Sequence, residues 1–298
     1  MQELSRKILE DYQVRKTKKQ KTAFIEFIKR ELPEADIQIE QGGLCKSRNI
    51  VIGDVEKAEY VLGAHYDTQP VLPFPNFLTP KNMFIYLLYV LAMVAGFSII
   101  VAAVSWVVGY LTKDSLFALI AGDGVLFVLL ALMLFGKANQ HTANDNTSGV
   151  ITLIEAYNIE EIRSKAAFVF FDHEEIGLFG SMYFAKKHKK TMKDKLLINF
   201  DCVSDGDTII LIQSKHAKKY EDRIKAAFVS NGTKTALVTD SSNTLYPSDQ
   251  ANFKCSVGVA AFKKNKLFGY YLDKIHTKKD TAFDERNIEF IIQGLRQL

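Results

Sequence analysis

The sequence predicts an α/β fold: a largely parallel, mixed sheet flanked by helices and interrupted by a two-helix transmembrane hairpin. Short apolar runs alternate with helical patterns along most of the chain, as is typical of such sheets. Two long apolar stretches with almost no charge lie between residues 83 and 136. With 298 residues, the chain is long enough to build one large domain around the sheet.

The strands and helices follow from hydrophobic spacing. Two helices are expected within residues 2–32, where Phe24, Phe27 and Ile28 form an apolar stripe that ends before Pro33. Seven runs have the length and composition of strands: Ile37–Ile39, Asn49–Ile52, Tyr60–His65, Ala166–Phe171, Leu196–Asp201, Thr208–Ile212 and Val257–Phe262. The longer, continuously apolar runs suit strands that are covered on both faces. Helical patterns follow at about residues 147–163, 178–189, 216–230 and 284–296.

The segment from residue 81 to 137 interrupts this order. Met83–Leu111 carries no charged residue, and its length suffices to cross a hydrocarbon core of ~30 Å with some tilt. Leu116–Gly136 follows a short polar turn and contains one ionisable residue, Asp123. Aromatic residues near both ends of the first stretch suit membrane interfaces: Tyr86, Tyr89, Trp106 and Tyr110.

We therefore predict that residues 81–137 form a transmembrane hairpin, inserted into a single discontinuous domain of residues 1–80 and 138–298. A pair of buried core helices or a hydrophobic dimerisation arm is the alternative. Asp123 would be costly at mid-membrane, so it either faces a partner or water, or pairs with a hydroxyl such as that of Ser105.

The charges favour a cytoplasmic domain on a protein with two membrane spans. Lys81 and Lys137 flank the hairpin on the domain side, against Lys113 in its turn. Three widely spaced cysteines and an N-terminus without a signal-like apolar region agree with this placement. The net charge of +4 is too small to suggest nucleic acid, so the expected partner is a bilayer around residues 83–136. The oligomeric state stays open.

A basic segment near the N-terminus needs its own interpretation. Its cations are Arg15, Lys16, Lys18, Lys19, Lys21, Lys29 and Arg30. They lie where helical apolar spacing is also present, so we interpret them as the solvated face of a helix. A patch for phosphate or anionic lipid is the alternative.

Acidic and histidine-bearing fragments lie at predicted strand ends. His65 and Asp67 are two positions apart and project to one face, so Asp67 can hold the imidazole through its second nitrogen. Asp145 opens a helix within Asn-Asp-Asn, either as an N-cap or as a carboxylate that bridges two cations.

Glu174 and Glu175 form the most specific fragment. They follow a strongly apolar strand, and two adjacent carboxylates there repel each other unless a cation separates their roles. One would bind a metal and the other would take a proton from water. Asp201 ends another apolar strand and His276 lies in a polar loop before the last helix; each alone is an ordinary residue.

In order, these motifs resemble the M28 family of zinc exopeptidases over most of the chain outside the hairpin. The matching fragments are His-x-Asp, Asn-Asp-Asn-x-Ser-Gly, Glu-Glu-x-Gly-x-x-Gly-Ser, an Asp after an apolar strand, and His-Thr-x-x-Asp-Thr. Ser248-Asp249-Gln250 also resembles a family segment, with Gln250 where histidine is common.

The resemblance implies two zinc ions, with other divalent transition metals as alternatives. One zinc would be held by His65, Asp145 and Asp201, and the other by Asp145, Glu175 and His276. Glu174 would act as general base and then acid, and Asp67 would orient His65.

The expected function is that of a membrane-anchored metallo-aminopeptidase, which hydrolyses N-terminal peptide bonds with a metal-activated water. A one-metal acyl-transfer relative (glutaminyl cyclase-like), a carboxypeptidase or a dipeptidase is the alternative among enzymes. A membrane-tethered binding module with a structural metal site is the alternative outside them. Gly136 precedes Asp145 by only nine residues, at most ~30 Å of chain, which suggests hydrophobic or membrane-derived peptides as substrates.

Overall fold

A nine-stranded sheet forms the centre of the computed structural model, which describes residues 1–298. The strand order is β1-β2-β4-β3-β5-β8-β6-β7, and β9 pairs with β8. The strands are β1 (Ile37–Gly42), β2 (Ser47–Ile52), β3 (Tyr60–His65), β4 (Ala166–Phe171), β5 (Leu196–Phe200), β6 (Thr208–Gln213), β7 (Thr235–Asp240), β8 (Ser256–Asn265) and β9 (Gly269–Tyr271). Strands from before and after the hairpin therefore join in one sheet.

The sheet is mixed: its central strands are parallel, antiparallel pairs lie on both sides of them, and the outermost pair β6–β7 is again parallel. Strand β3 runs parallel to β4 and β5, and β5 runs parallel to β8. The β1–β2, β2–β4 and β6–β8 pairs are antiparallel. The predicted mixed α/β architecture is confirmed, and the carboxyl ends of β3, β4 and β5 lie at one edge.

Two strands were missed for a physical reason. β7 is exposed to half-buried along its length, so it lacks the continuous apolar run that marks a buried strand. β9 has only three residues and pairs with the end of β8.

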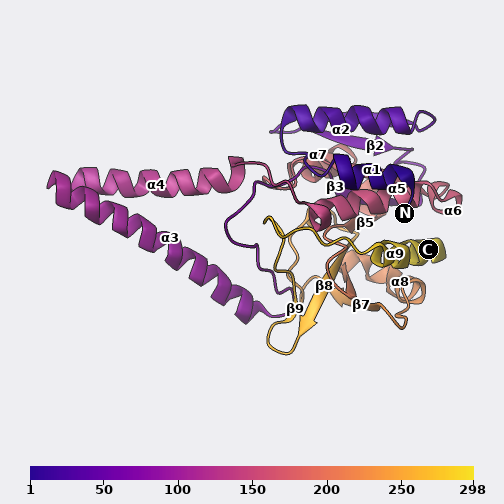
Figure 1. Ribbon diagram of the computed structural model, residues 1–298. Helices are drawn as coiled ribbons and strands as arrows, with labels where there is room; N and C mark the ends of the chain where they lie inside the picture. The colour runs from indigo at the N-terminus through magenta and orange to yellow at the C-terminus, as the bar shows by residue number, and fades with distance from the viewer.

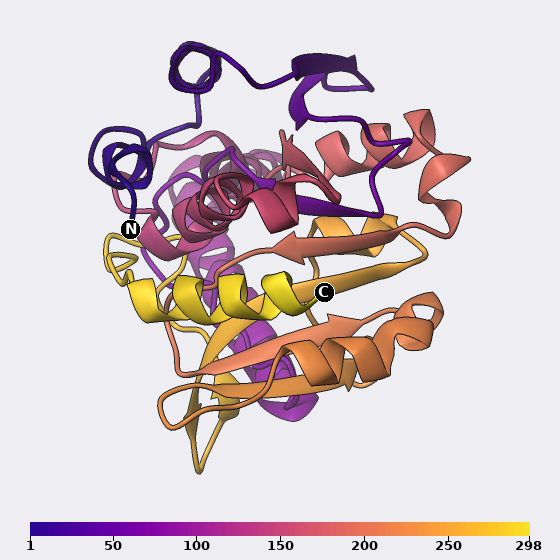
Figure 2. The ribbon, with the colours of Figure 1, turned by 90° about the vertical axis from the view of Figure 1, so that its right-hand side faces the viewer.

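Helices cover both faces of the sheet (Figures 1 and 2). They are α1 (Glu3–Asp11), α2 (Lys18–Glu31), α5 (Gly149–Tyr157), α6 (Glu160–Arg163), α7 (Phe179–Lys187), α8 (Glu221–Ala227) and α9 (Glu285–Gln297). Successive strand residues point to opposite faces. Leu62 accordingly belongs to the larger core, which includes α1, α2, α5, α8 and α9, whereas Val61 packs in the smaller core with Phe184 of α7.

The interrupting segment forms two long helices, α3 (Met83–Thr112) and α4 (Ser115–Phe135), close to the predicted limits. Both are long and apolar enough to cross a membrane. They extend away from the domain and diverge from their common turn towards it (Figure 1). No residue of α3 is buried and only Gly122 of α4 is, so the alternative of buried core helices is wrong.

Glycines bring the two helices together near the turn. A Cβ on Gly122 would lie 2.2 Å from the Ser105 hydroxyl, and one on Gly109 would lie 3.2 Å from the Cβ of Ala118. Small residues permit such close approach of apolar helices. The Ser105 hydroxyl lies against Gly122, so the alternative in which it pairs with Asp123 is wrong. The Asp123 side chain is exposed and has no polar partner in the chain.

The basic segment near the N-terminus is only partly a solvated face. Arg15 and Lys21 are buried, so the interpretation is wrong for these two residues. The Nζ atom of Lys21 lies 2.6 Å from the carboxylate of Asp172 just after β4. Arg15 donates to the carbonyl oxygen of Tyr66 at 2.5 Å. Both cations thus tie the N-terminal helices to the edge of the sheet that carries the predicted site.

Candidate metal centre

The five predicted ligands meet at the carboxyl edge of the central strands. His65 ends β3, Glu175 follows β4 and Asp201 follows β5. Asp145 lies in an irregular turn, Ala143–Ser148, that leads into α5, and His276 lies in the loop between β9 and α9. Parallel strands bring the first three positions together, because their carboxyl ends share an edge.

One group of side chains consists of His65, Asp145 and Asp201. Their ligand atoms all lie within 4.8 Å of one another, and all three residues are buried. The Nε2 atom of His65 is 3.4 Å from Asp145 Oδ1 and 3.6 Å from Asp201 Oδ1.

A second group consists of Asp145, Glu175 and His276. The Nε2 atom of His276 is 2.8 Å from Asp145 Oδ2 and 3.6 Å from Glu175 Oε2. Asp145 therefore presents one carboxylate oxygen to each group, which is the arrangement that a bridging carboxylate requires.

The donors in both groups fit a divalent transition metal. Glu175 Oε1 and Asp201 Oδ1 are buried without a hydrogen-bond partner. Buried carboxylates without a partner are costly, and a cation compensates for that cost. Imidazole nitrogen and carboxylate oxygen are ligands that zinc accepts.

The crowding of carboxylates also changes the ionisation of the site. Burial raises the pKa of Glu174 well above its usual value, and the nearby carboxylates of Asp201, Asp249 and Asp145 add to the rise. Burial alone would lower the pKa of His65, but the surrounding carboxylates, Glu174 first, outweigh it and raise that pKa. A metal at these groups would replace protons as the compensating charge.

Asp67 contacts both the imidazole ring of His65 and the backbone of the turn that carries Glu174 and Glu175. Its carbonyl oxygen lies 3.1 Å from Nδ1 of His65, and its carboxylate lies 3.7 Å from the same nitrogen. The carboxylate accepts the backbone N–H groups of Glu174 at 3.0 Å and Glu175 at 3.4 Å. Asp67 therefore positions the glutamate turn as well as the imidazole ring, a contact that the sequence did not predict.

Asp280 supports the site, and sequence reasoning assigned it no role. Its carboxylate accepts the backbone N–H groups of Asn144 and Asp145, each at 3.0 Å. Burial raises the pKa of Asp280 to about 8, with Asp145 as the next contributor. The signal for this residue was the final Asp of the His-Thr-x-x-Asp-Thr fragment.

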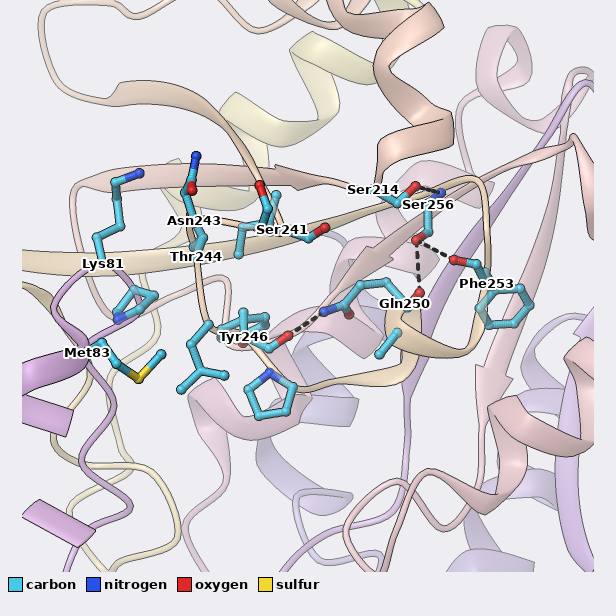
Figure 3. A pocket seen from close by; sticks show the side chains of 16 residues that line it. Lys81, Met83, Ser214, Ser241, Asn243, Thr244, Tyr246, Gln250, Phe253 and Ser256 are labelled. Atoms are coloured by element: carbon cyan, nitrogen blue, oxygen red, sulfur yellow. Dashed lines mark hydrogen bonds between the residues drawn. The ribbon is translucent and has the colours of Figure 1, made fainter. Parts of the chain in front are cut away.

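Two cavities lie at the site. The smaller, about 230 Å³, is lined by Asp145, Glu174, Glu175, Asp201 and His276 together with apolar side chains that include Tyr86 of α3. A neighbouring pocket of about 550 Å³ shares Tyr246 and Pro247 with it (Figure 3). The first turn of the hairpin lines both cavities, through Tyr86 and Met83.

Gln250, where the sequence departs from the family segment, supports the wall between these cavities. Its side-chain N–H donates to the carbonyl of Tyr246 at 2.8 Å (Figure 3), and its Oε1 accepts from Asn199 at 3.0 Å. The Tyr246 hydroxyl in turn donates to the carbonyl of Asp201 at 2.9 Å. Gln250 thus supports Tyr246, whose hydroxyl contacts the backbone of the predicted ligand Asp201.

Comparison with known proteins shows the family to which this chain belongs. The model of peptidase family M28 matches residues 123–290, more than half of the chain, so this protein belongs to that family. The match includes Asp145, Glu174, Glu175, Asp201 and His276 but not His65, which the fold brings to them. The family implies a zinc-dependent peptidase that acts on peptides. Comparison with curated proteins found no similar sequence.

Solved structures share the fold at low sequence identity. A glutaminyl cyclase from Porphyromonas gingivalis has a TM-score of 0.61 at 15% identity, covering 98% of this chain and 93% of its own. A Zn-dependent exopeptidase from Parabacteroides distasonis has a TM-score of 0.60 at 15% identity, with coverages of 98% and 94%. The LapA aminopeptidase of Legionella pneumophila has a TM-score of 0.57 at 14% identity; the match covers 98% of this chain and 66% of that longer one.

Proposed function

We propose that this protein is a membrane-anchored metallo-aminopeptidase that hydrolyses the N-terminal peptide bond of its substrates. The observation that carries the proposal is the pair of ligand groups that share Asp145, with Glu174 beside them. A purely structural metal site would not need this extra carboxylate. Residues 1–80 and 138–298 would form one discontinuous catalytic domain, into which residues 81–137 are inserted.

The ligand groups define which residues would hold two zinc ions. His65, Asp145 and Asp201 would hold one, and Asp145, Glu175 and His276 the other. Bound there, zinc supplies a Lewis acid that polarises a carbonyl and lowers the pKa of water.

Glu174 is the group left to move protons. It would take a proton from the attacking water and deliver it to the leaving amine, as general base and then general acid. Asp67 holds the backbone of Glu174 and so fixes where this carboxylate lies.

The hairpin supports an assignment of substrate class. Tyr86, in the first turn of α3, lines the metal cavity together with Leu78 and Ile275. If α3 and α4 cross a bilayer, the site lies close to its surface, and apolar side chains face the entering peptide. Hydrophobic or membrane-derived peptides are therefore the proposed substrates, and the flanking lysines favour a cytoplasmic domain.

The test replaces the proposed proton carrier without changing its shape. We expect Glu174→Gln to retain zinc, while turnover of aminoacyl reporter substrates falls by ~10²–10⁴-fold because an amide cannot accept the proton. Zinc content and kcat are measured on the full chain in detergent. Glu161→Gln, which changes an exposed glutamate of α6, is the matched control and should behave as wild type.

Several results would contradict the proposal. Unchanged turnover in Glu174→Gln would remove its role, and absence of hydrolysis by the zinc-loaded wild type would favour the binding module. A short peptide panel separates the other enzymes: release of the N-terminal residue supports the proposal, whereas release of the C-terminal residue or cyclisation of an N-terminal glutamine overturns it.

A further inference from the structure

The two hairpin helices enclose an apolar cleft at their domain end, separate from the metal centre. It has a volume of about 600 Å³, within the ~300–1,000 Å³ of small-molecule sites. Met93 and Phe97 of α3 and Leu129 and Leu132 of α4 form its walls, and the segment 71–74 lines its domain end.

The cleft exists because the helices are close at one end only. Gly109 and Gly122 let them pack tightly near the turn, and they diverge towards the domain (Figure 1). Gly96 faces this opening, and a Cβ added there would meet nothing within 4 Å. A larger side chain at this position would fill the cleft without displacing the backbone.

Lysines that form no ion pair lie at the domain end of the cleft and in the pocket beside it. Lys137 lines the cleft directly. A second pocket of about 340 Å³ shares Val71, Leu72 and Pro73 with the cleft and is lined by Lys278 and Lys279. These three lysines make no ion pair, and the acidic residue of this second pocket, Asp273, is paired with Lys263. Lys16, whose amine donates to the carbonyl of Leu134 at 3.1 Å, adds a fourth cation near the end of α4.

We propose that this cleft binds an acyl chain of an anionic phospholipid whose phosphate rests against Lys137 and Lys278. The proposal rests on the membrane anchorage proposed above. Inside a bilayer, acyl chains rather than water surround the protein, so an acyl chain is the apolar group that can fill this cleft. An acyl chain that moves from the surrounding lipid into the cleft gains little from the hydrophobic effect. The charge of the headgroup therefore determines which lipid binds more tightly.

The proposed lipid would lie next to the candidate metal centre. The segment 71–73 lines both the cleft and the lysine-lined pocket beside it. The N–H of Val71 donates to the carbonyl of Lys137 and that of Leu72 to the carbonyl of His276, each at 2.8 Å. One wall of the lipid site is therefore hydrogen-bonded to the backbone of a predicted zinc ligand.

Native mass spectrometry of the full chain in mild detergent tests the proposal, with phosphatidylglycerol and phosphatidylcholine of identical acyl chains as probes. We expect one phosphatidylglycerol per chain and at least ~10-fold weaker binding of phosphatidylcholine. Gly96→Phe, which fills the cleft, should lower phosphatidylglycerol binding ~10-fold or more. The double substitution Lys137→Ala/Lys278→Ala should remove the preference for the anionic lipid, while both lipids still bind weakly through their acyl chains.

Matched controls alter the same helices outside the site. Ile99→Phe adds bulk on an exposed face of α3, and Lys113→Ala removes a cation from the distant turn; both should bind lipid as wild type does. Circular dichroism and zinc content confirm that each variant is folded.

Equal binding of the two lipids, or unchanged binding in Gly96→Phe, would overturn the lipid site. Binding of oleate without phosphatidylglycerol would also overturn it, in favour of a free fatty acid. Membrane pelleting after alkaline washing separates this failure from loss of the anchor. If the protein pellets with the membrane but does not bind the anionic lipid, the anchor is retained and only the lipid site is refuted. If the alkaline wash releases the protein, the proposed anchorage itself is refuted.

Discussion

At the scale of residues, the position of Asp145 depends on backbone contacts as much as on its own side chain. Asp280 accepts the N–H of Asp145 and that of Asn144. Asn144 accepts the N–H groups of Ser204 and Asp205 through its side-chain oxygen at 2.7 and 3.0 Å. The turn that presents both oxygens of Asp145 is thus held by one side chain and two backbone N–H groups that are far away in sequence.

Asp280→Asn should therefore weaken zinc binding without unfolding the sheet. One of the two accepting oxygens becomes an amide N–H group that faces a backbone donor, so Asp145 loses its fixed orientation. Loss of such support around a metal ligand typically costs ~10–100-fold in affinity. Competition with a zinc chelator measures the change, and Asp194→Asn, an exposed aspartate, is the control. Wild-type affinity in Asp280→Asn would contradict this role.

At the scale of elements, a buried ion pair connects α2 to the end of β4. Lys21 and Asp172 are 4% and 1% exposed, and their charged atoms are 2.6 Å apart. Asp172 also accepts the backbone N–H of Arg48 in β2 and of His173, both at 2.9 Å. It therefore fixes the start of the turn that carries Glu174, and Lys21 compensates its charge.

Lys21→Met should destabilise the protein by about 3–5 kcal/mol, because it leaves the Asp172 carboxylate buried without its cation. Urea unfolding of the full chain in detergent measures the loss. Lys19→Met removes an exposed lysine of the same helix and should change the free energy of unfolding by less than ~0.5 kcal/mol. Equal effects of the two substitutions would show that the ion pair contributes nothing.

At the scale of the whole molecule, the hairpin and the domain meet at the cavities. The same first turn of α3 that would enter the bilayer also lines the metal cavity, through Tyr86. Removing the hairpin would therefore remove part of the substrate site. Under the proposed function, this shared wall would couple membrane attachment to substrate binding.

The proposed orientation can be checked with the cysteines of the chain. Cys45 in the domain is partly exposed, whereas Cys202 and Cys255 are buried. In intact cells, we expect an impermeant maleimide to leave Cys45 unlabelled until lysis and to label Lys113→Cys in a Cys45→Ser background. Cys45→Ser alone serves as the unlabelled control. Labelling of Cys45 before lysis would place the domain on the outer side.

The sequence by itself determined the features that depend on neighbouring residues. Buried strands such as Ala166–Phe171, the two long apolar helices and the ordered site motifs are local patterns of side chains, so they can be read without a fold. Only the tertiary structure decided which charges are buried, what Asp280 and Gln250 support, and where α3 and α4 diverge. Those features depend on distant contacts: Lys21 meets Asp172 across 151 positions and Asp280 meets Asp145 across 135, separations at which local spacing carries no information.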